Sequence, residues 1–307
     1  MIEVKNITKR YGGVKALDDI SFTADSGEVV GLLGPNGAGK STTMNIITGY
    51  LGSTSGTVLI DGADILTAPK AAKAKIGYLP EQPPLYLDMT VRRYLEFIFD
   101  LKKVRLPKKE HINEVMEIVK IADVADRVIK NLSKGYRQRV GFAGALMGNP
   151  PVLILDEPTV GLDPKQIIDI RKLIKSLGKK HTIIFSSHVL SEVSAVCDRI
   201  VMINNGKLVA DAKTDELSET LSGSGILALE VDGAVATVRS AISSVDGVKR
   251  VTKGAGLSYT VEFETGVDIR RGVFNALSKA NCPILMMRPG GMTLEESFLK
   301  LTEGGEG

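Results

Sequence analysis

A short glycine-rich segment, residues 34–41, has the composition of a phosphate-binding loop. It reads Gly-Pro-Asn-Gly-Ala-Gly-Lys-Ser and follows the apolar run 29–33, which is typical of a buried strand. Such glycines let successive backbone N–H groups turn toward phosphate oxygens, the lysine supplies a positive charge, and the serine hydroxyl can ligate magnesium. The sequence therefore predicts a site for a nucleoside triphosphate. The candidate nucleotide-binding residues are Gly34, Pro35, Asn36, Gly37, Ala38, Gly39, Lys40, Ser41 and Thr42.

Two adjacent carboxylates, Asp156 and Glu157, could supply a metal ligand and a base. They follow the apolar run 152–155, so we expect them at the carboxyl end of a buried strand, where α/β sheets bind ligands. This pattern is typical of a Walker B motif, in which Asp156 holds magnesium, directly or through water, and Glu157 polarises the attacking water. An isolated Asp-Glu pair is more often a solvated turn, but the preceding strand and the phosphate-binding loop favour the catalytic interpretation.

The composition limits the class of protein. The 307 residues are 43% hydrophobic, enough for one large α/β domain and a smaller one, and the net charge of +3 gives no reason to expect a nucleic-acid partner. Cys197 and Cys282 lack metal-ligand spacing, which favours reduced core residues in a cytosolic protein. The chain begins with a strand pattern, and no apolar run reaches membrane-spanning length. We therefore expect any membrane association to occur through another protein.

The elements that must position these residues form one α/β domain. Strands with alternating apolar residues predict an antiparallel β subdomain. A helical period over 91–126, with a break at Leu106-Pro107, predicts a helical subdomain. Apolar runs separated by helices predict a wound sheet. The expected strands are 2–7, 20–23 and 57–60 in the β subdomain and 152–155, 182–185 and 200–203 in the wound sheet. The helix positions expected to be buried are Tyr94, Leu95, Ile98, Leu101, Ile112, Val115, Met116 and Val119.

A second domain is expected after the linker-like stretch 222–225, Ser-Gly-Ser-Gly. Beyond it, the order strand, helix, strand, strand, helix, strand fits a ferredoxin-like split β-α-β unit. The predicted domains are thus 1–221, which binds the nucleotide, and 226–307, a small α+β accessory domain whose last helix opens at the capping box Thr293-Leu294-Glu295-Glu296. Its other expected elements are strands at 226–231, 247–252, 257–263 and 283–287 and helices at 234–244 and 267–280.

Residues 132–139, Leu-Ser-Lys-Gly-Tyr-Arg-Gln-Arg, resemble the signature of ATP-binding cassette (ABC) ATPases. Each motif alone is weak evidence for this family, but several motifs occur in the family's order over residues 1 to about 220. The matching residues are Tyr11 as the aromatic, Gln82 as the Q-loop glutamine, Ser133 and Gly135 in the signature, Asp163 in the D-loop Gly161-Leu162-Asp163-Pro164, and His188 as the switch histidine.

The resemblance implies a role for each matching residue. Tyr11 would stack on adenine, and Gln82 would act at the catalytic site and ligate magnesium. His188 would contact the γ-phosphate, and Asp163 would couple two catalytic sites. ATP and magnesium are the implied cofactors.

The resemblance implies that Ser133 and Gly135 contact ATP held by the phosphate-binding loop of a second subunit. The chain agrees with this, since it holds one such loop and one signature. The implied assembly is a head-to-tail homodimer or a heterodimer with a related subunit. Lys134 and Tyr136 depart from the commoner family pattern, in which glycine and glutamine are frequent. Ser133 can still cap a helix and Gly135 still allows close approach, so only the strength of ATP-driven association is in doubt.

The resemblance extends to the ATPase subunits of ABC exporters of the drug-resistance and gliding-motility types. These power a separately encoded membrane permease, which implies a cytoplasmic location at the inner face of the membrane. Permease helices would dock between the Q-loop and the helical subdomain, and residues 80–89 would report the nucleotide state, although Pro83-Pro84 could simply set the entry to the helix at Val91. An importer subunit is one alternative. A soluble ABC ATPase acting on ribosomes or DNA is another, disfavoured by the single cassette and the absence of a basic stripe.

The accessory domain carries no comparable motif. Tyr259 and Phe263 fall on one face of the strand 257–263, and packing explains them better than RNA stacking. Dimerisation, regulation of the ATPase and contact with the permease are all compatible with this domain. The transported substrate would be chosen by the permease.

Overall fold

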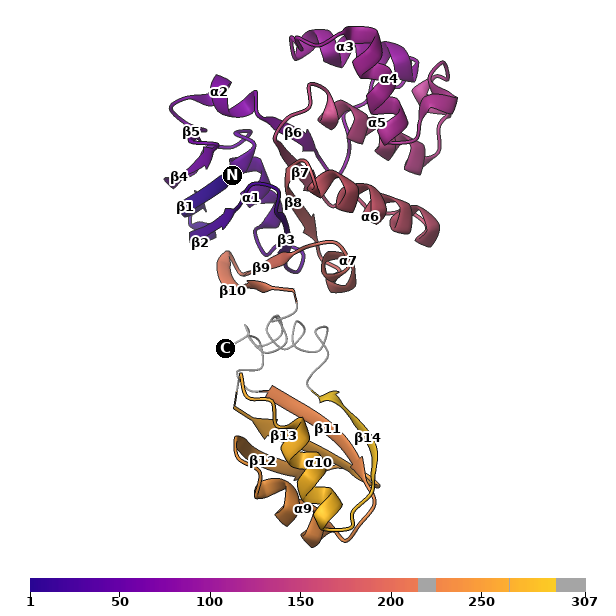
Figure 1. Cartoon of the computed structure of the whole chain (residues 1–307). Coiled ribbons are helices and arrows are strands. Elements are labelled where there is room, and N and C mark those ends of the chain that lie inside the picture. Colours follow the sequence, from indigo (N-terminus) through magenta and orange to yellow (C-terminus); the bar gives the residue numbers. More distant parts are fainter. Residues whose placement is uncertain (215–224, 265, 291–307) are drawn as a thin grey trace. The chain divides into compact units, whose positions relative to one another are not determined.

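The computed structural model describes residues 1–214, 225–264 and 266–290 (Figure 1). The chain divides into two compact units, Met1–Thr214 and Asp215–Gly307. Of the predicted linker 222–225, only Gly225 is described, where it begins a strand. The predicted helix that opens at Thr293 lies outside the described residues. The predicted domain boundary therefore stays a prediction.

An antiparallel sheet forms the β subdomain of the first unit (Figure 1). Its strands are β1 (Ile2–Tyr11), β2 (Val14–Ala24), β4 (Ser55–Ile60) and β5 (Ala63–Asp64). They lie in the order β2-β1-β4-β5, and the three predicted strands are all present and longer than predicted. Asp61 and Gly62 join β4 to β5 with φ angles of 50° and 77°, the left-handed values that a tight hairpin requires.

A mostly parallel wound sheet forms the centre of the first unit. Its strands are β3 (Val29–Leu33), β6 (Ile76–Leu79), β7 (Val152–Asp156), β8 (Thr182–Ser187), β9 (Arg199–Asn204) and β10 (Lys207–Lys213). The order is β10-β9-β3-β8-β7-β6, and β10 is antiparallel to β9. Every residue of β3, β7 and β8 is buried, as expected for strands covered on both faces. The parallel strands end at one edge, which gathers the loops that follow them.

The remaining elements of the first unit are helices. They are α1 (Lys40–Ile47), α2 (Pro69–Lys73), α3 (Val91–Leu101), α4 (Lys108–Ile118), α5 (Lys134–Leu146), α6 (Pro164–Gly178) and α7 (Leu190–Ser194), with 3-10 turns η1 (Ala122–Val124) and η2 (Ile129–Asn131). Figure 1 shows α3, α4 and α5 grouped as the predicted helical subdomain. The predicted break is present, because Pro107 is the N-cap of α4.

The predicted buried face of α3 was wrong at Leu101, which is 65% exposed. Phe99, which is 5% exposed, takes the buried position instead. Phe99 lies one helical turn after the buried Leu95 and therefore on the same face, whereas Leu101, six residues after Leu95, points about 120° away from it. Ile98 is only half-buried, and the other predicted positions of this subdomain are buried.

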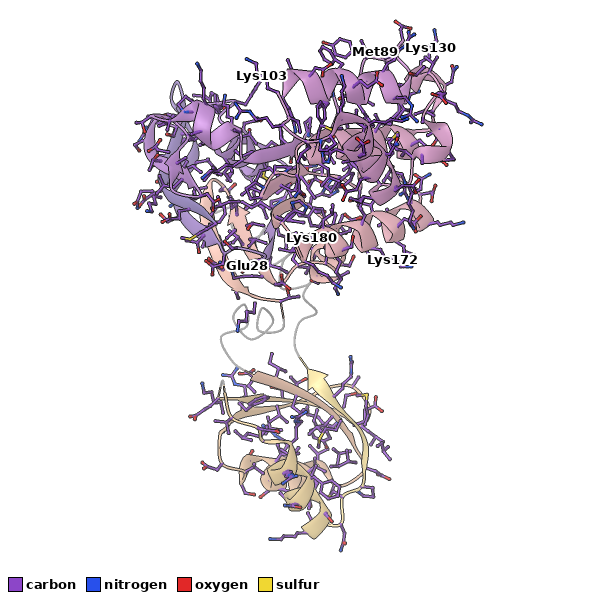
Figure 2. All side chains as sticks on the ribbon, turned by 45° about the horizontal axis from the view of Figure 1, so that its top comes forward. Glu28, Met89, Lys103, Lys130, Lys172 and Lys180 are labelled. Carbon is purple, nitrogen blue, oxygen red and sulfur yellow. The ribbon has the colours of Figure 1, made fainter. Side chains whose placement is uncertain are left out.

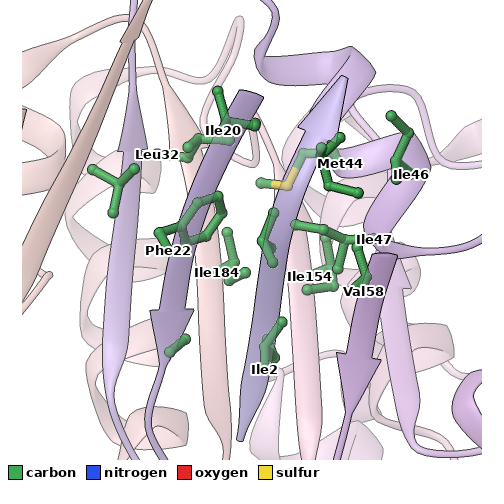
Figure 3. Packing of buried hydrophobic residues seen from close by; sticks show 14 of the residues in the cluster. Ile2, Ile20, Phe22, Leu32, Met44, Ile46, Ile47, Val58, Ile154 and Ile184 are labelled. Atoms are coloured by element: carbon green, nitrogen blue, oxygen red, sulfur yellow. The ribbon is translucent and has the colours of Figure 1, made fainter. Parts of the chain in front are cut away.

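One hydrophobic core joins the two sheets and α1 (Figure 3). Its members include Ile2, Ile20, Phe22 and Val58 from the β subdomain, Leu32, Ile154 and Ile184 from the wound sheet, and Met44, Ile46 and Ile47 from α1. Burying each such side chain contributes about 1.5–3 kcal/mol. This packing fixes α1, and with it the phosphate-binding loop that precedes the helix.

The second unit has the predicted order of strands and helices. Its elements are β11 (Gly225–Val231), α9 (Val235–Ser243), β12 (Val248–Lys253), β13 (Ser258–Phe263), α10 (Arg270–Lys279) and β14 (Ile284–Gly290). The antiparallel sheet has the order β12-β13-β11-β14. Tyr259 is buried and Phe263 packs against the same core, together with Val238 of α9 and Val273 of α10. Packing on the helix-covered face therefore accounts for both aromatic residues.

Charged side chains such as Lys103, Lys130 and Lys172 lie on the outer surface of the first unit (Figure 2). Cys197 and Cys282 are buried and free, as predicted. Within the described residues, no helix is both long and apolar enough to span a membrane.

Candidate nucleotide site

A pocket of about 340 Å³ lies at the edge where the parallel strands end. It is lined by Ala16, Asn36, Gly37, Gly39, Lys40, Ser41, Thr42, Glu81, Glu157, Val160 and His188. The structure thus brings most of the predicted phosphate-binding loop together with two of the predicted catalytic residues. We call this hollow the nucleotide pocket.

The backbone of the loop requires glycine where it enters α1. Gly39 has a φ of 114°, and a Cβ there would lie 2.6 Å from Cδ2 of Leu17 and 3.0 Å from the carbonyl oxygen of Ala16. Both the left-handed conformation and the close approach exclude other residues. Lys40, the next residue, begins α1, so its side chain starts from a rigid helical turn.

Lys40 is the positive centre of the pocket, although it is only 6% exposed. Its Nζ donates to the carbonyl oxygen of Gly34 at 2.7 Å and lies 3.7 Å from Oε1 of Glu157. Burial lowers the pKa of Lys40, while the carboxylates of Glu157 and Asp156 act in the opposite sense. An ammonium group held by carbonyl oxygens and one carboxylate is well placed to exchange these partners for phosphate oxygens.

The acidic pair differs in burial and in partners. Asp156 ends β7 and accepts a hydrogen bond of 2.6 Å from Oγ of Ser186. Burial raises the pKa of Asp156, and the hydrogen bond from Ser186 opposes that effect. Glu157 has a φ of 46°, an uncommon value for a residue with a side chain. Its N–H donates to the same Ser186 oxygen at 2.9 Å, which holds the turn in place.

Glu157 and His188 form a direct pair. Nδ1 of His188 lies 3.0 Å from Oε2 and 3.1 Å from Oε1 of Glu157. The Glu157 side chain is almost buried, whereas that of His188 is 44% exposed. The pair therefore joins a shielded carboxylate to an imidazole that a ligand can reach from the pocket.

The structure places the Q-loop side chain outside the lining of the nucleotide pocket, and the catalytic and metal-binding roles expected of it stay predictions. Gln82 does not line the nucleotide pocket, but the preceding residue, Glu81, does. Leu79 and Leu155 are the last paired residues of β6 and β7, and Glu81 and Glu157 each follow by two positions. Sequence reasoning missed Glu81 because the register of the two strands, rather than the residue type, decides which side chain faces the pocket.

Gln82 lines a second, mainly apolar hollow of about 590 Å³ between the end of β6 and the helical subdomain. Its other lining residues are Asn45, Tyr50, Ile76, Tyr78, Leu79, Pro80, Pro83, Pro84, Tyr94, Ile98, Lys102, Gly141, Gly144 and Ala145. We call this hollow the helical groove. It lies where the resemblance placed the permease contact.

The signature residues lie at the start of α5. Ser133 is the N-cap, and its hydroxyl accepts from the N–H of Tyr136 at 3.4 Å. A Cβ on Gly135 would lie 2.5 Å from Oε1 of Gln166 in α6, so the Gln166 side chain packs directly over this glycine. No residue of 132–139, all of which are described, lines the nucleotide pocket.

Both departures from the usual signature have partners in the same chain. The ammonium group of Lys134 covers Gly161 so closely that a Cβ there would not fit. The hydroxyl of Tyr136 donates to Oδ2 of Asp123 at 2.9 Å. Tyr136 therefore attaches the signature to η1, and the Lys134 side chain lies beside the D-loop segment.

Asp163 and Tyr11 lie outside the pocket lining. Asp163 is the N-cap of α6, where Oδ1 accepts from the N–H of Gln166 at 2.9 Å. Tyr11 is 50% exposed, and Nζ of Lys9 lies 5.3 Å from its ring centre. An exposed ring with a cation on one face leaves the other face available for stacking.

The residues present fit a magnesium ion bound together with a triphosphate. Magnesium is commonly held by one or two carboxylates plus substrate phosphates rather than by an all-protein cage. The pocket supplies the hydroxyl of Ser41 and the carboxylate of Glu81, with Asp156 at the end of the adjacent strand. In the part of the chain that the structure describes, no group of three or more His, Cys, Asp or Glu could hold a metal by itself.

Comparison with known proteins gives the class. The ABC transporter family matches residues 17–160. The linearmycin resistance ATP-binding protein LnrL of Bacillus subtilis (strain 168) is 35% identical over 98% of this chain and 98% of its own length. The bacitracin transport ATP-binding protein BcrA of Bacillus licheniformis is 38% identical over 71% of this chain and 72% of its own length. The chain therefore belongs to the ABC transporter family, as an ATP-binding subunit.

Comparison with solved structures gives the same class of protein. The chain resembles the ATP-binding cassette MJ0796, crystallised as a dimer in a post-hydrolysis state with ADP and phosphate, with a TM-score of 0.64 and 28% identity. The match covers 70% of this chain and 99% of that one. The protein is an ATPase of the cassette type.

Proposed function

We propose that this chain is the ATP-hydrolysing subunit of an ABC exporter and that it works in a head-to-tail dimer. The observation that most directly supports this proposal is that Lys40, Glu157 and His188 line one pocket. Neither Ser133 nor Gly135 lines it. A second subunit would supply its signature to that pocket. The dimeric crystal structures of a similar cassette support this arrangement.

In the proposed site, residues 34–42 bind the phosphates and Glu157 takes the proton of the attacking water. His188 keeps the Glu157 carboxylate oriented through the contact at 3.0 Å and presents its exposed ring to the terminal phosphate. Tyr11 stacks on the adenine. Asp163, which caps α6 in the loop that also touches Lys134, couples the two sites.

Magnesium, held by Ser41 and Asp156, would neutralise part of the phosphate charge. We assign the role of facing the magnesium from the end of β6 to Glu81 in place of Gln82, because Glu81 lines the pocket. A carboxylate there suits a divalent cation better than an amide does.

The helical groove is the proposed docking site for a helix of a membrane permease. Its lining is mainly apolar and includes Tyr50, Tyr78, Pro83 and Tyr94, which suits the apolar face of an amphipathic helix. Gln82 projects into this groove while its neighbour Glu81 faces the nucleotide. Adjacent residues of one loop would thus link the nucleotide to the permease and keep the subunit at the inner face of the cell membrane.

The relatives support export. LnrL and BcrA are named for antibiotic resistance and transport, and a third relative, LptB of Escherichia coli (strain K12), is named for lipopolysaccharide export. LptB is 36% identical over 70% of this chain and 92% of its own length. An antibiotic or another amphipathic molecule is the proposed class of substrate.

The experiment that tests this proposal is purification of the tagged Glu157→Gln variant, trapped with ATP, from gently solubilised membranes of its native cells. We expect a multi-span membrane protein to copurify, as identified by mass spectrometry. Recovery only in the soluble fraction with ribosomes or DNA would reject the transporter function. In inside-out vesicles carrying the complex, an exporter accumulates its substrate inside on addition of ATP, whereas an importer depletes it.

A further inference from the structure

A buried carboxylate, Glu192, lies close to the catalytic pair without lining the nucleotide pocket. It belongs to α7 and is only 8% exposed. Its Oε2 accepts two hydrogen bonds, from Oγ1 of Thr159 at 2.6 Å and from Oγ of Ser187 at 3.2 Å. One carboxylate oxygen therefore joins two loops that are distant in sequence.

These two loops carry Glu157 and His188. Thr159 follows Glu157 by two residues, and the N–H of Val160 donates to the carbonyl oxygen of Glu157 at 3.2 Å, which closes the turn. Ser187 immediately precedes His188, and the Ser187 hydroxyl also accepts from the N–H of Val189 at 3.0 Å. The residues on both sides of His188 are thus fixed to a hydroxyl group that Glu192 holds.

The charge environment of Glu192 argues against a role in stability alone. Its ion pair with Nη2 of Arg171 is long, at 4.0 Å, and the short contacts come from uncharged hydroxyls. A buried carboxylate without a close counter-charge is costly for folding compared with an apolar residue. Its geometry is instead suited to setting the positions of two loops.

We infer that Glu192 is a positioning residue for ATP hydrolysis. Through Thr159 and Ser187 it holds the loop after β7 in register with the loop after β8. The contact between Glu157 and His188 at 3.0 Å then forms at one fixed place in the pocket. Glu192 itself touches neither nucleotide nor water in this role.

Histidine NMR gives a direct test, because the chain contains only three histidines. The full-length protein, labelled at histidine, would be compared with Glu192→Leu, which removes both acceptor oxygens, and with Glu192→Gln, which retains one oxygen able to accept both hydroxyls. We expect Glu192→Leu to shift the ring signals of His188 while those of His111 and His181 stay in place. Glu192→Gln should restore the His188 signals.

Kinetics should separate positioning from binding. For Glu192→Leu we expect kcat to fall by about 10- to 100-fold, as when a catalytic group is displaced, with the Kd for ATP unchanged within about twofold. Thr159→Val combined with Glu192→Leu should cost no more than Glu192→Leu alone, since both remove the same link. Should Glu192→Leu fail to fold, Thr159→Val with Ser187→Ala breaks the same contacts more mildly. Unchanged His188 signals and a kcat within about twofold of the wild type would overturn the inference.

Discussion

Glu157 combines several features expected of a catalytic carboxylate. Its left-handed backbone, with a φ of 46°, is held by the hydrogen bond from its N–H to Ser186, and its carboxylate lies between Lys40 and His188. Strained backbone at a site of this kind persists only where the surroundings hold it. The side chain is thereby aimed into the pocket at little further entropic cost.

Replacing Glu157 with glutamine should separate ATP binding from hydrolysis. The amide keeps the shape of the side chain but cannot accept the proton of the attacking water, so we expect kcat to fall by roughly 100- to 10,000-fold. The affinity for ATP, measured with a fluorescent analogue, should stay near that of the wild type. Near-normal phosphate release by this variant would show that another group is the base.

Glu81 and Gln82 offer a matched pair of adjacent substitutions. Glu81 lines the nucleotide pocket, whereas Gln82 lines the helical groove. We expect Glu81→Ala to raise the magnesium concentration needed for half-maximal ATP binding by about tenfold, the effect of losing roughly 1.4 kcal/mol. Gln82→Ala should leave this concentration unchanged and weaken the association with the permease. A magnesium titration that distinguished the variants in the opposite order would restore Gln82 to the nucleotide site.

At the scale of elements, Arg199 connects the wound sheet to the β subdomain. At the start of β9, its Nε donates to Oε1 of Glu28 at 2.8 Å, and its guanidinium also contacts Asp211 of β10 and the carbonyl oxygen of Thr23 in β2. Burial would raise the pKa of Glu28, but the hydrogen bonds from Arg199 and from the N–H of Asp25 outweigh it and lower the pKa.

This lowered pKa predicts a pH-dependent contribution to stability. The contribution is complete above the unfolded-state pKa of Glu28, whose ordinary value is 4.5, and is lost as the pH falls through the lower folded-state pKa. At pH 7, Arg199→Met should cost about 1.5–3 kcal/mol, or about 3–12 °C in Tm for the first unit. Calorimetry at pH 7 and at pH 4 should show a smaller difference from the wild type at the lower pH. An equal difference at both pH values would mean that the Glu28 charge contributes little.

At the scale of the whole molecule, the separation of Ser133 from the nucleotide pocket agrees with the proposed head-to-tail dimer. Tyr136 holds the signature to Asp123 of the same chain through its hydroxyl. A signature that is already ordered in the single subunit loses less conformational freedom when it meets the nucleotide of a partner.

We therefore expect Glu157→Gln to form a dimer with ATP and magnesium, detected by light scattering as a doubling of mass. Ser133→Ala in the same background removes the cap, worth about 0.5–2 kcal/mol, and an oxygen facing the partner's phosphate. This double variant should need at least about tenfold more protein to dimerise. Ser133→Thr, which keeps both the cap and the hydroxyl oxygen, is the matched control. Dimerisation that did not depend on ATP or on Ser133 would contradict the head-to-tail arrangement.

The sequence by itself determined the local features of this protein. The glycines and Lys40 of the phosphate-binding loop, the acidic pair after an apolar run, and the strand and helix order of the second unit could be predicted because each depends on neighbouring residues and on apolar periodicity. In the first unit, β5, β6 and β10 were not predicted. Buried positions followed the same periodicity, and the exception was Leu101, where Phe99 occupies the buried face of α3.

Only the tertiary structure decided which distant or adjacent side chains share the site. The register of β6 against β7 brings Glu81, and not Gln82, to the lining of the nucleotide pocket. Likewise, the parallel pairing of β7 with β8 brings Thr159 and Ser187 within reach of Glu192. Strand register and loop contacts depend on packing between segments that are far apart in the chain, so no local pattern specifies them.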